Sequence, residues 1–171
     1  PSRPAILLGH AQDVVDRASA LLEDPGISVV PEARTMINTG GVTGLHDVTE
    51  GGLAMAVREI AAASGLGAVV DADAVPYTPE TTAIADALNL NPLGMLGSGS
   101  LLATVDPELI DSVITASEHA GFTVTDLGHL HVENDQVMIQ RGDTRSPMPQ
   151  FDTDEVSRAL NTYRTGGNRN T

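Results

Sequence analysis

The run from His46 to Leu53 combines the side chains and the glycines that a phosphate-binding turn needs. Its candidate residues are His46, Asp47, Thr49, Glu50, Gly51 and Gly52. The run follows an expected strand and opens an expected helix, whose first N–H groups lack intrahelical partners and, with the helix dipole, favour an anion. Glycine lets a phosphate oxygen approach the backbone without a Cβ in the way. In one interpretation Asp47 and Thr49 orient the loop or bind a phosphate-bound Mg²⁺; in the other they cap the helix after an ordinary tight turn.

A second glycine-rich turn, Gly97-Ser98-Gly99, precedes an expected strand rather than a helix. No helix dipole acts there, but the backbone can form an anion nest, with the hydroxyl of Ser98 or Ser100 as a further donor. A plain chain reversal accounts for the same residues. Neither turn matches G-x-x-x-x-G-K-[ST], because the chain has no lysine, and neither matches the dinucleotide pattern G-x-G-x-x-G.

The sequence offers little that would hold a metal ion. His129 and His131 would share one face of a strand, as in a two-ligand clamp, but no third ligand accompanies them. Exposed strand histidines are the simpler interpretation. Cysteine is absent, which excludes disulfides, cysteine nucleophiles and thiolate metal sites. We therefore predict no metal site, and we assign no catalytic residue.

The charge of the chain excludes several classes of partner. The 171 residues include 23 acidic and 9 basic side chains, which gives a formal charge of −14, and every basic residue is an arginine. Such a chain repels nucleic-acid backbones and anionic membrane surfaces. No apolar run approaches the length of a membrane span. These features predict a cytoplasmic protein, and the acidity without lysine is typical of a halophilic organism; an acidic mesophile protein is the alternative.

Hydrophobic periodicity predicts an α+β fold, three-layer α/β/α, in which helices pack on a mixed β-sheet. The expected helices cover residues 11–23, 31–38, 53–64 and 80–88, and one more opens at Pro107 and ends at Gly121. The expected strands cover residues 42–48, 67–71, 100–105 and 122–127, followed by a hairpin over 131–140 that turns at 133–135. Residues 141–151 are expected to be a link, 153–160 a short helix and 163–171 a frayed tail.

Taken together, the two turns resemble the C-terminal domain of the aminoimidazole ribonucleotide (AIR) synthase superfamily over about residues 27–130. The resemblance is carried by the run His46 to Leu53, by Ile60-Ala61, Ser64-Gly65-Leu66-Gly67 and Leu90-Asn91-Pro92-Leu93, and by Gly97-Ser98-Gly99-Ser100-Leu101-Leu102. Order and spacing agree best with the HypE-like branch of hydrogenase maturation factors. The corresponding parts of that branch read approximately Asp-Pro-Thr-Arg-Gly-Gly-Leu, Ile-Ala…Ser-Gly-Val-Gly and Gly-Leu-Asp-Pro-Leu.

The resemblance implies ATP-dependent chemistry, because family members bind ATP with Mg²⁺ and phosphorylate an oxygen, sulfur or selenium atom. It implies that residues 1–140 form the family domain and that 141–171 are a link, a short helix and a flexible tail. It also implies a homodimer, an unidentified small-molecule or protein substrate, and an N-terminal domain outside this chain that holds most of the Mg²⁺ site, so that the chain alone is inactive. The residues that it assigns to the phosphates are Asp47, Thr49, Gly51, Gly52, Gly97, Ser98 and Gly99, with His46, Glu50 and Ser100 in support.

Two departures from the HypE-like pattern bear on the reaction. The maturation factors end in a cysteine that carries the group to be dehydrated, whereas this chain ends Gly166-Gly167-Asn168-Arg169-Asn170-Thr171. They also resemble Asn-Glu-Gly where this chain has Gly97-Ser98-Gly99, so a carboxylate able to transfer a proton is missing. We therefore expect a HypE-like, AIR synthase-related protein of unassigned substrate. A non-catalytic binding or dimerisation domain that keeps the fold is the alternative.

Overall fold

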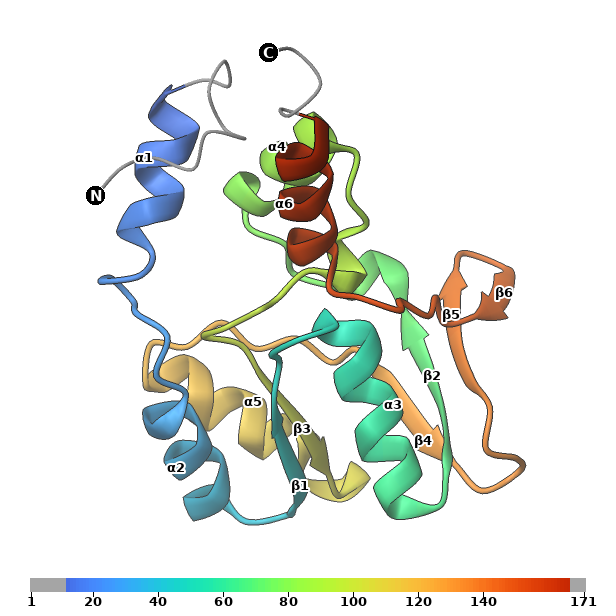
Figure 1. Cartoon of the computed structure of the whole chain (residues 1–171). Coiled ribbons are helices and arrows are strands. Elements are labelled where there is room, and N and C mark those ends of the chain that lie inside the picture. Colours follow the sequence, from blue (N-terminus) through green and yellow to red (C-terminus); the bar gives the residue numbers. More distant parts are fainter. Residues whose placement is uncertain (1–11, 167–171) are drawn as a thin grey trace.

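A computed structural model of the chain describes residues 12–166. These residues form helices interspersed with short strands (Figure 1). The helices are α1 (Gln12–Ala20), α2 (Val30–Thr39), α3 (Gly52–Ser64), α4 (Pro79–Leu88), α5 (Ile110–His119) and α6 (Glu155–Gly166). The strands are β1 (Val42–Asp47), β2 (Gly67–Asp71), β3 (Leu101–Val105), β4 (Gly128–His131), β5 (Val137–Arg141) and β6 (Thr144–Pro147). A short 3₁₀ turn, η3 (Pro92–Gly94), precedes the second glycine-rich turn.

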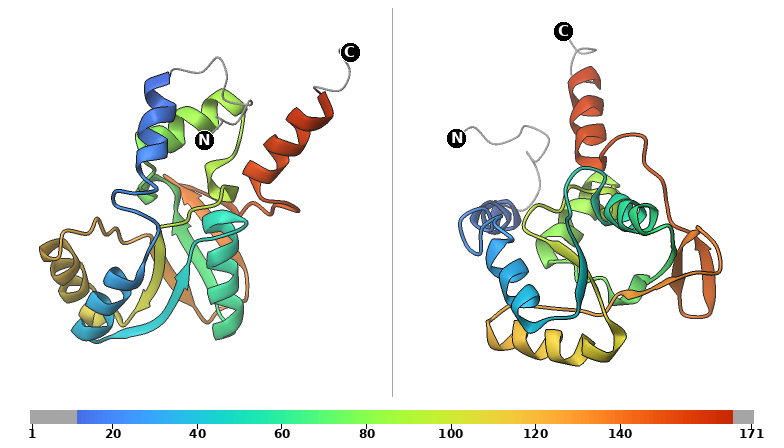
Figure 2. Two further views of the ribbon diagram at one scale, coloured as in Figure 1. Left: turned by 60° about the vertical axis from the view of Figure 1, so that its left-hand side comes forward. Right: turned by 90° about the horizontal axis from the view of Figure 1, so that it is seen from below.

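The strands form two sheets that share one covering helix. Strands β1 and β3 pair antiparallel, and the larger sheet has the order β4-β2-β5-β6. Within it, β2 and β5 run parallel while the other neighbours are antiparallel, so the sheet is mixed. Helix α3 packs against β1 as well as β2 and β5, and α2 packs against α5 and β1 (Figure 2). The prediction of a mixed sheet with packed helices is confirmed.

Helix α3 lies on the core because its small apolar residues recur at helical spacing. Ala54, Val57 and Ala61 are buried, and they pack with Ala68 and Val70 of β2. The alanines present little side chain toward the sheet, which lets the helix and the sheet approach closely. The prediction of an apolar face on this helix is confirmed. Because α3 begins at Gly52, the first glycine-rich turn lies at the N-terminal end of a helix that packs on the core.

The predicted hairpin over residues 131–140 is wrong, and so is the strand over 122–127. Strand β4 begins only at Gly128, and β4 and β5 lie on opposite sides of β2 instead of pairing with each other. The connection between them therefore crosses the start of β2. The turn-forming residues at 133–135 do not distinguish the two arrangements. A tight hairpin and a connection that passes over an intervening strand use the same residue types.

The C-terminal part also departs from the prediction. The expected link over 141–151 contains β6, which pairs with β5 through a turn at Gly142. The short helix expected over 153–160 extends to Gly166, into the stretch expected to be frayed. The rest of the predicted tail, 167–171, lies outside the described residues.

The crossing depends on Gly67, the first residue of β2, and we expect Gly67→Ala to destabilise the fold. A Cβ at this position would stand 2.7 Å from the backbone oxygen of Gln136 and would also meet that of Asn134. Backbone atoms cannot rotate away as side chains do, so the cost should be about 2 kcal/mol of unfolding free energy. Urea denaturation measures it. A variant as stable as the parent would show that the chain does not cross β2 at Gly67.

Candidate functional site

The two glycine-rich turns lie side by side at one end of the β1–β3 pair. Asp47, the last residue of β1, pairs with Leu101, the first of β3. The pairing continues beyond the strands, because the Val48 amide donates to the Ser100 carbonyl at 3.0 Å. A Cβ at Gly97 would stand 2.8 Å from Cγ1 of Val48, so the turns are in van der Waals contact. Residues that are about fifty positions apart in sequence are thus brought into contact.

The first turn uses its two glycines for backbone geometry. Gly51 and Gly52 have φ values of 79° and 62°, in the left-handed region that glycine favours. The Gly52 amide donates to the Thr49 carbonyl at 3.0 Å, and the Gly51 amide donates to Oδ2 of Asp154 at 3.2 Å. Both amides that we expected to face a phosphate are therefore engaged within the chain.

Some polar side chains of the first turn face solvent, and others hold the local structure together. Asp47 and Glu50 are exposed and Thr49 is half-buried. Helix α3 has Gly51 at its N-cap and no side-chain cap, so the interpretation of Asp47 and Thr49 as helix caps is wrong. His46 lies 2.8 Å through Nε2 from Oε2 of Glu59 and 2.6 Å through Nδ1 from the Asp47 carbonyl. Because both ring nitrogens have partners, His46 ties β1 to α3.

The second turn has several free hydrogen-bond donors. Ser98, Gly99 and Ser100 are exposed, and Gly99 has a φ of 93°. The Ser100 amide closes the turn by donating to the Gly97 carbonyl at 2.9 Å. Within residues 12–166, the amides of Ser98 and Gly99 and the two serine hydroxyls have no hydrogen-bond partner. This turn therefore has the donors that an anion nest requires.

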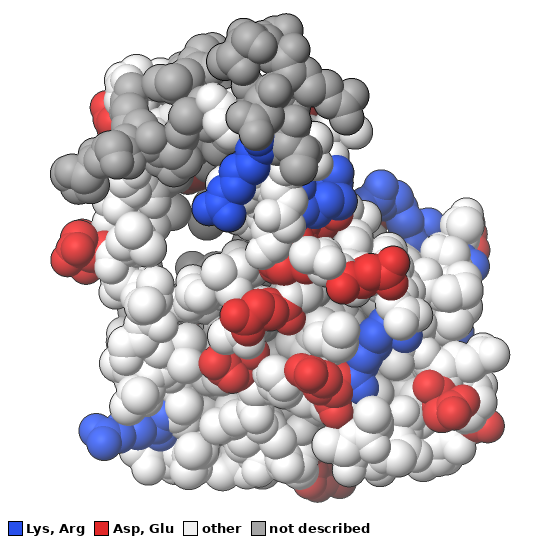
Figure 3. Space-filling model, viewed as in Figure 1, with Lys and Arg blue, Asp and Glu red and all other residues white. Residues whose placement is uncertain are grey.

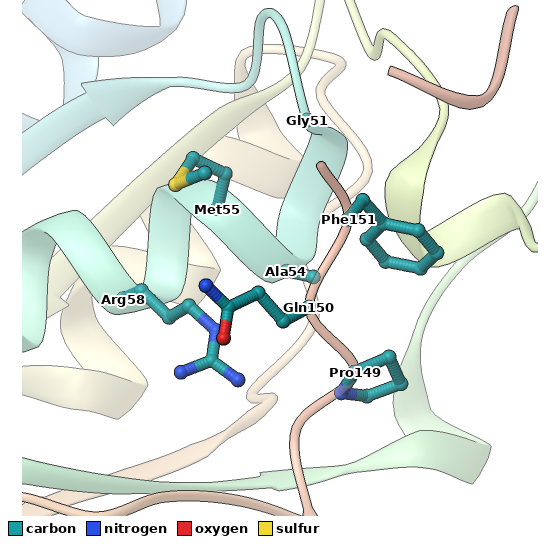
Figure 4. A pocket seen from close by; sticks show the side chains of 7 residues that line it. All are labelled: Gly51, Ala54, Met55, Arg58, Pro149, Gln150 and Phe151. Carbon is teal, nitrogen blue, oxygen red and sulfur yellow. The ribbon is translucent and has the colours of Figure 1, made fainter. Parts of the chain in front are cut away.

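Residues that the sequence analysis missed cover the start of α3. Residues 148–155, which we call the C-terminal strap, run across α3 (Figure 4). The strap leads from the end of β6 to the first residue of α6. Arg58 of α3 donates to the Met148 carbonyl, and the Phe151 ring lies against Gly94. The pocket between helix and strap leaves no room for a water molecule, and its lining residues are Gly51, Ala54, Met55, Arg58, Pro149, Gln150 and Phe151.

The strap could not have been placed from local sequence signals. Asp154 has the residue type of a helix N-cap, and its Oδ1 does accept from the Val156 amide at 2.8 Å. Its second partner, the Gly51 amide, lies 103 positions away. No local pattern reports a contact at that separation.

Glu155 anchors the end of the strap and is only 6% exposed. Its carboxylate accepts from Nε and Nη2 of Arg158 at 2.6 and 2.7 Å and from the Asn91 amide at 2.9 Å. The hydrogen bonds from Arg158, and then that from Asn91, hold the pKa of Glu155 below its usual range although burial opposes the shift. The strap is thus fixed to both the α3 and the η3 side of the site.

Acidic side chains are spread over the face of the molecule that Figure 3 shows. Among residues 12–166 there is no group of three or more histidine, aspartate or glutamate side chains placed to hold a metal ion. The rings of His129 and His131 lie 6.3 Å apart between centroids. No described helix is both long and apolar enough to cross a membrane.

Comparison with known proteins agrees with this architecture. A family model described as "AIR synthase related protein, C-terminal domain" matches residues 5–140. Carbamoyl dehydratase HypE of Rhizobium leguminosarum bv. viciae is 35% identical over 109 residues, which cover 61% of this chain and 31% of that protein.

Solved HypE structures share the fold. The crystal structure of E. coli HypE superposes with a TM-score of 0.69 at 24% identity, over 82% of this chain and 47% of that one. A HypE solved in complex with ATP gives a TM-score of 0.66 at 18% identity, over 78% of this chain and 47% of that one. The chain thus spans about a third of the length of the HypE relative and about half of these solved chains. With its paired glycine-rich turns on a mixed α/β scaffold, it belongs to the AIR synthase-related protein family as a C-terminal domain.

Proposed function

We propose that the chain is the C-terminal domain of an ATP-dependent, HypE-like enzyme, and that its two glycine-rich turns contribute to the site for the ATP phosphates. The observation that carries the proposal is that the turns meet at one end of β1 and β3, with the amides of Ser98 and Gly99 and the hydroxyls of Ser98 and Ser100 unengaged among the described residues. The choice of ATP as the nucleotide is supported by a relative named carbamoyl dehydratase HypE and by a HypE structure solved in complex with ATP. In this proposal Asp47, Thr49, Gly51 and Gly52 shape the neighbouring wall of the site, and His46 and Glu50 support it.

The remainder of the site belongs in this proposal to an N-terminal domain beyond the chain. The chain spans about a third of the HypE relative, and its described residues contain no cluster of three metal ligands. Asp47 and Thr49 carry side-chain oxygens at the first turn that would supplement a Mg²⁺ held mainly by that domain. Mg²⁺ would neutralise phosphate charge during transfer to an oxygen, sulfur or selenium atom of an unidentified small-molecule or protein substrate. We further propose a homodimer in the cytoplasm of a halophilic organism.

A non-catalytic binding or dimerisation domain is the second candidate, and one observation favours it. The amides of Gly51 and Gly52 are already hydrogen-bonded to Asp154 and to the Thr49 carbonyl. The first turn is therefore less available to a phosphate than its sequence indicates. The two candidates make different predictions for the second turn. The first predicts that it binds the phosphates of ATP, and the second predicts that it does not.

Titration of the chain with Mg-ATP in molar KCl, followed by amide NMR, tests the proposal. We expect selective shifts at Ser98 and Gly99, because their amides are free donors on an exposed turn. Ser98→Ala should weaken ATP binding several-fold, about the value of one hydrogen bond. The matched control is Ser112→Ala, at an exposed position of α5. If the chain joined to its N-terminal domain binds no nucleotide at saturating Mg-ATP, the proposed function is wrong.

A further inference from the structure

Exposed apolar side chains occur on both segments that meet at the second glycine-rich turn. Residues 21–29, which we call the α1–α2 linker, join the end of α1 to the start of α2. The linker side chains of Leu22 and Ile27 are 64% and 56% exposed. Leu96, which directly precedes the second turn, is 45% exposed. Single exposed apolar residues are ordinary, but several at one place are typical of a binding surface.

The α1–α2 linker contacts the second turn directly. A Cβ on Gly99 would stand 3.0 Å from the carbonyl oxygen of Gly26 and 3.5 Å from Cα of Ile27. The Gly26 amide donates to the Leu21 carbonyl at 3.1 Å, which closes a tight turn around Leu22. Ile27 therefore borders the second turn, and Leu22 belongs to the linker turn that ends beside it.

Free donors and exposed apolar side chains thus adjoin each other. The residues of the second turn whose amides or hydroxyls have no hydrogen-bond partner within residues 12–166 are Ser98, Gly99 and Ser100. Ile27 and Leu96 flank these donors. Ligand sites combine apolar walls with a few polar groups that fix orientation, so this surface fits a ligand with one anionic and one apolar end. The exposed carboxylates of Glu23 and Asp24 on the linker disfavour a ligand that is anionic throughout.

We propose that Leu22, Ile27 and Leu96 form the apolar wall of the nucleotide site and receive the base, while the second turn holds the phosphates. The proposal rests on the proposed function, because it takes the second turn as the phosphate site. A nucleotide has charged phosphates at one end and a flat ring at the other, which matches the two parts of this surface. The wall holds the ring by removing apolar area from water. The α1–α2 linker thereby becomes part of the ligand site.

Removing one side chain of the wall separates the two ends of the ligand. Ile27→Ser replaces an exposed side chain, so it leaves the core intact. In the chain joined to its N-terminal domain, we expect this variant to bind Mg-ATP about tenfold more weakly, as the loss of one aliphatic contact implies. Inorganic tripolyphosphate with Mg²⁺ should bind the variant and the parent equally, because it has no base. Calorimetry measures both affinities.

Val132→Ser is the matched control, because Val132 is 86% exposed on the loop after β4. It should change neither affinity. An equal loss of ATP affinity in this control would overturn the proposal, and so would a loss in Ile27→Ser that tripolyphosphate shares. It would also be overturned if Ile27→Ser kept the ATP affinity of the parent. A lower Tm of the joined protein in that case would make the linker a contact with the N-terminal domain.

The outcome is separate from that of the proposed function. Binding of both phosphate probes with amide shifts at Ser98 and Gly99 would uphold the proposed function even where Ile27→Ser has no effect. Where neither phosphate probe binds, the proposed function is wrong, and adenosine alone decides the fate of the wall. Shifts of the Ile27 methyl groups on addition of adenosine would then uphold the wall, and unshifted methyl groups would overturn it.

Discussion

Gly52→Ala should lower the unfolding free energy by about 3 kcal/mol, the largest loss that we expect from a single methyl group in this chain. A Cβ on Gly52 would stand 2.5 Å from the backbone oxygen of Met95 and 2.6 Å from that of Leu93. Its φ of 62° adds the cost of a left-handed conformation to that overlap. The segment that the methyl group would push away leads directly into the second glycine-rich turn. The two turns should therefore separate, with changed amide shifts at Ser98 and Gly99, and denaturant unfolding measures the loss.

Gly65→Ala separates the two contributions to that loss. Gly65 ends α3 with a φ of 66°, close to that of Gly52, but a Cβ there would meet nothing within 4 Å. It should cost only about 1 kcal/mol, which is the left-handed term alone. Equal losses in the two variants would show that the approach of the Leu93–Met95 backbone does not determine the need for glycine at position 52.

Glu155→Gln should cost about 2 kcal/mol at pH 7, because the amide has only one acceptor oxygen, so at least one of the three hydrogen bonds to the buried carboxylate is lost and the others weaken. The folded state depresses the pKa of Glu155 below the ordinary value of 4.5. Its contribution to stability is therefore fully present above pH 4.5 and is lost as the pH falls through the folded-state pKa. The difference between parent and variant should shrink toward zero in that range. Thermal unfolding at constant ionic strength from pH 7 to pH 3 measures it.

Asp13→Asn is the control for this pH dependence. Arg17 also lowers the pKa of Asp13, but the two side chains are 54% and 69% exposed, so solvent screens the pair. We expect the stability of this variant to follow the parent curve. A difference for Glu155→Gln that stayed constant down to pH 3 would contradict the role of its charge.

The reach of sequence reasoning in this chain follows the range of the interactions involved. Helix α3 and strand β2 were predictable, because the repeat of Ala and Val along α3 and the Gly65 stop are local signals. Sequence reasoning also singled out the two turns, in which Gly51, Gly52 and Gly99 have positive φ values that favour glycine. The register of β1 and β3, which brings the turns together, depends on pairing that no local pattern encodes.

The same limit explains what was missed. Strand β6 is short, exposed and contains a proline, so its sequence resembles a link. Arg58 reads as a polar residue on an amphipathic helix, and only the strap shows that it is half-buried without an ion pair. Asp154 gave a helix-start signal, yet its contact with Gly51 arises from the tertiary fold.

The position of β2 between β4 and β5 also constrains how the chain folds. Both neighbours of β2 lie about 60–70 residues further along the chain, so each pairing closes a long loop. High contact order of this kind slows folding. On a nascent chain it leaves one edge of β2 unpaired until β4 is made, and the other until β5 ends at Arg141. Val69 and Val70, which are buried in the finished sheet, are then available to other unpaired strands. Aggregation should therefore compete with folding most strongly during synthesis, before the last third of the chain has left the ribosome.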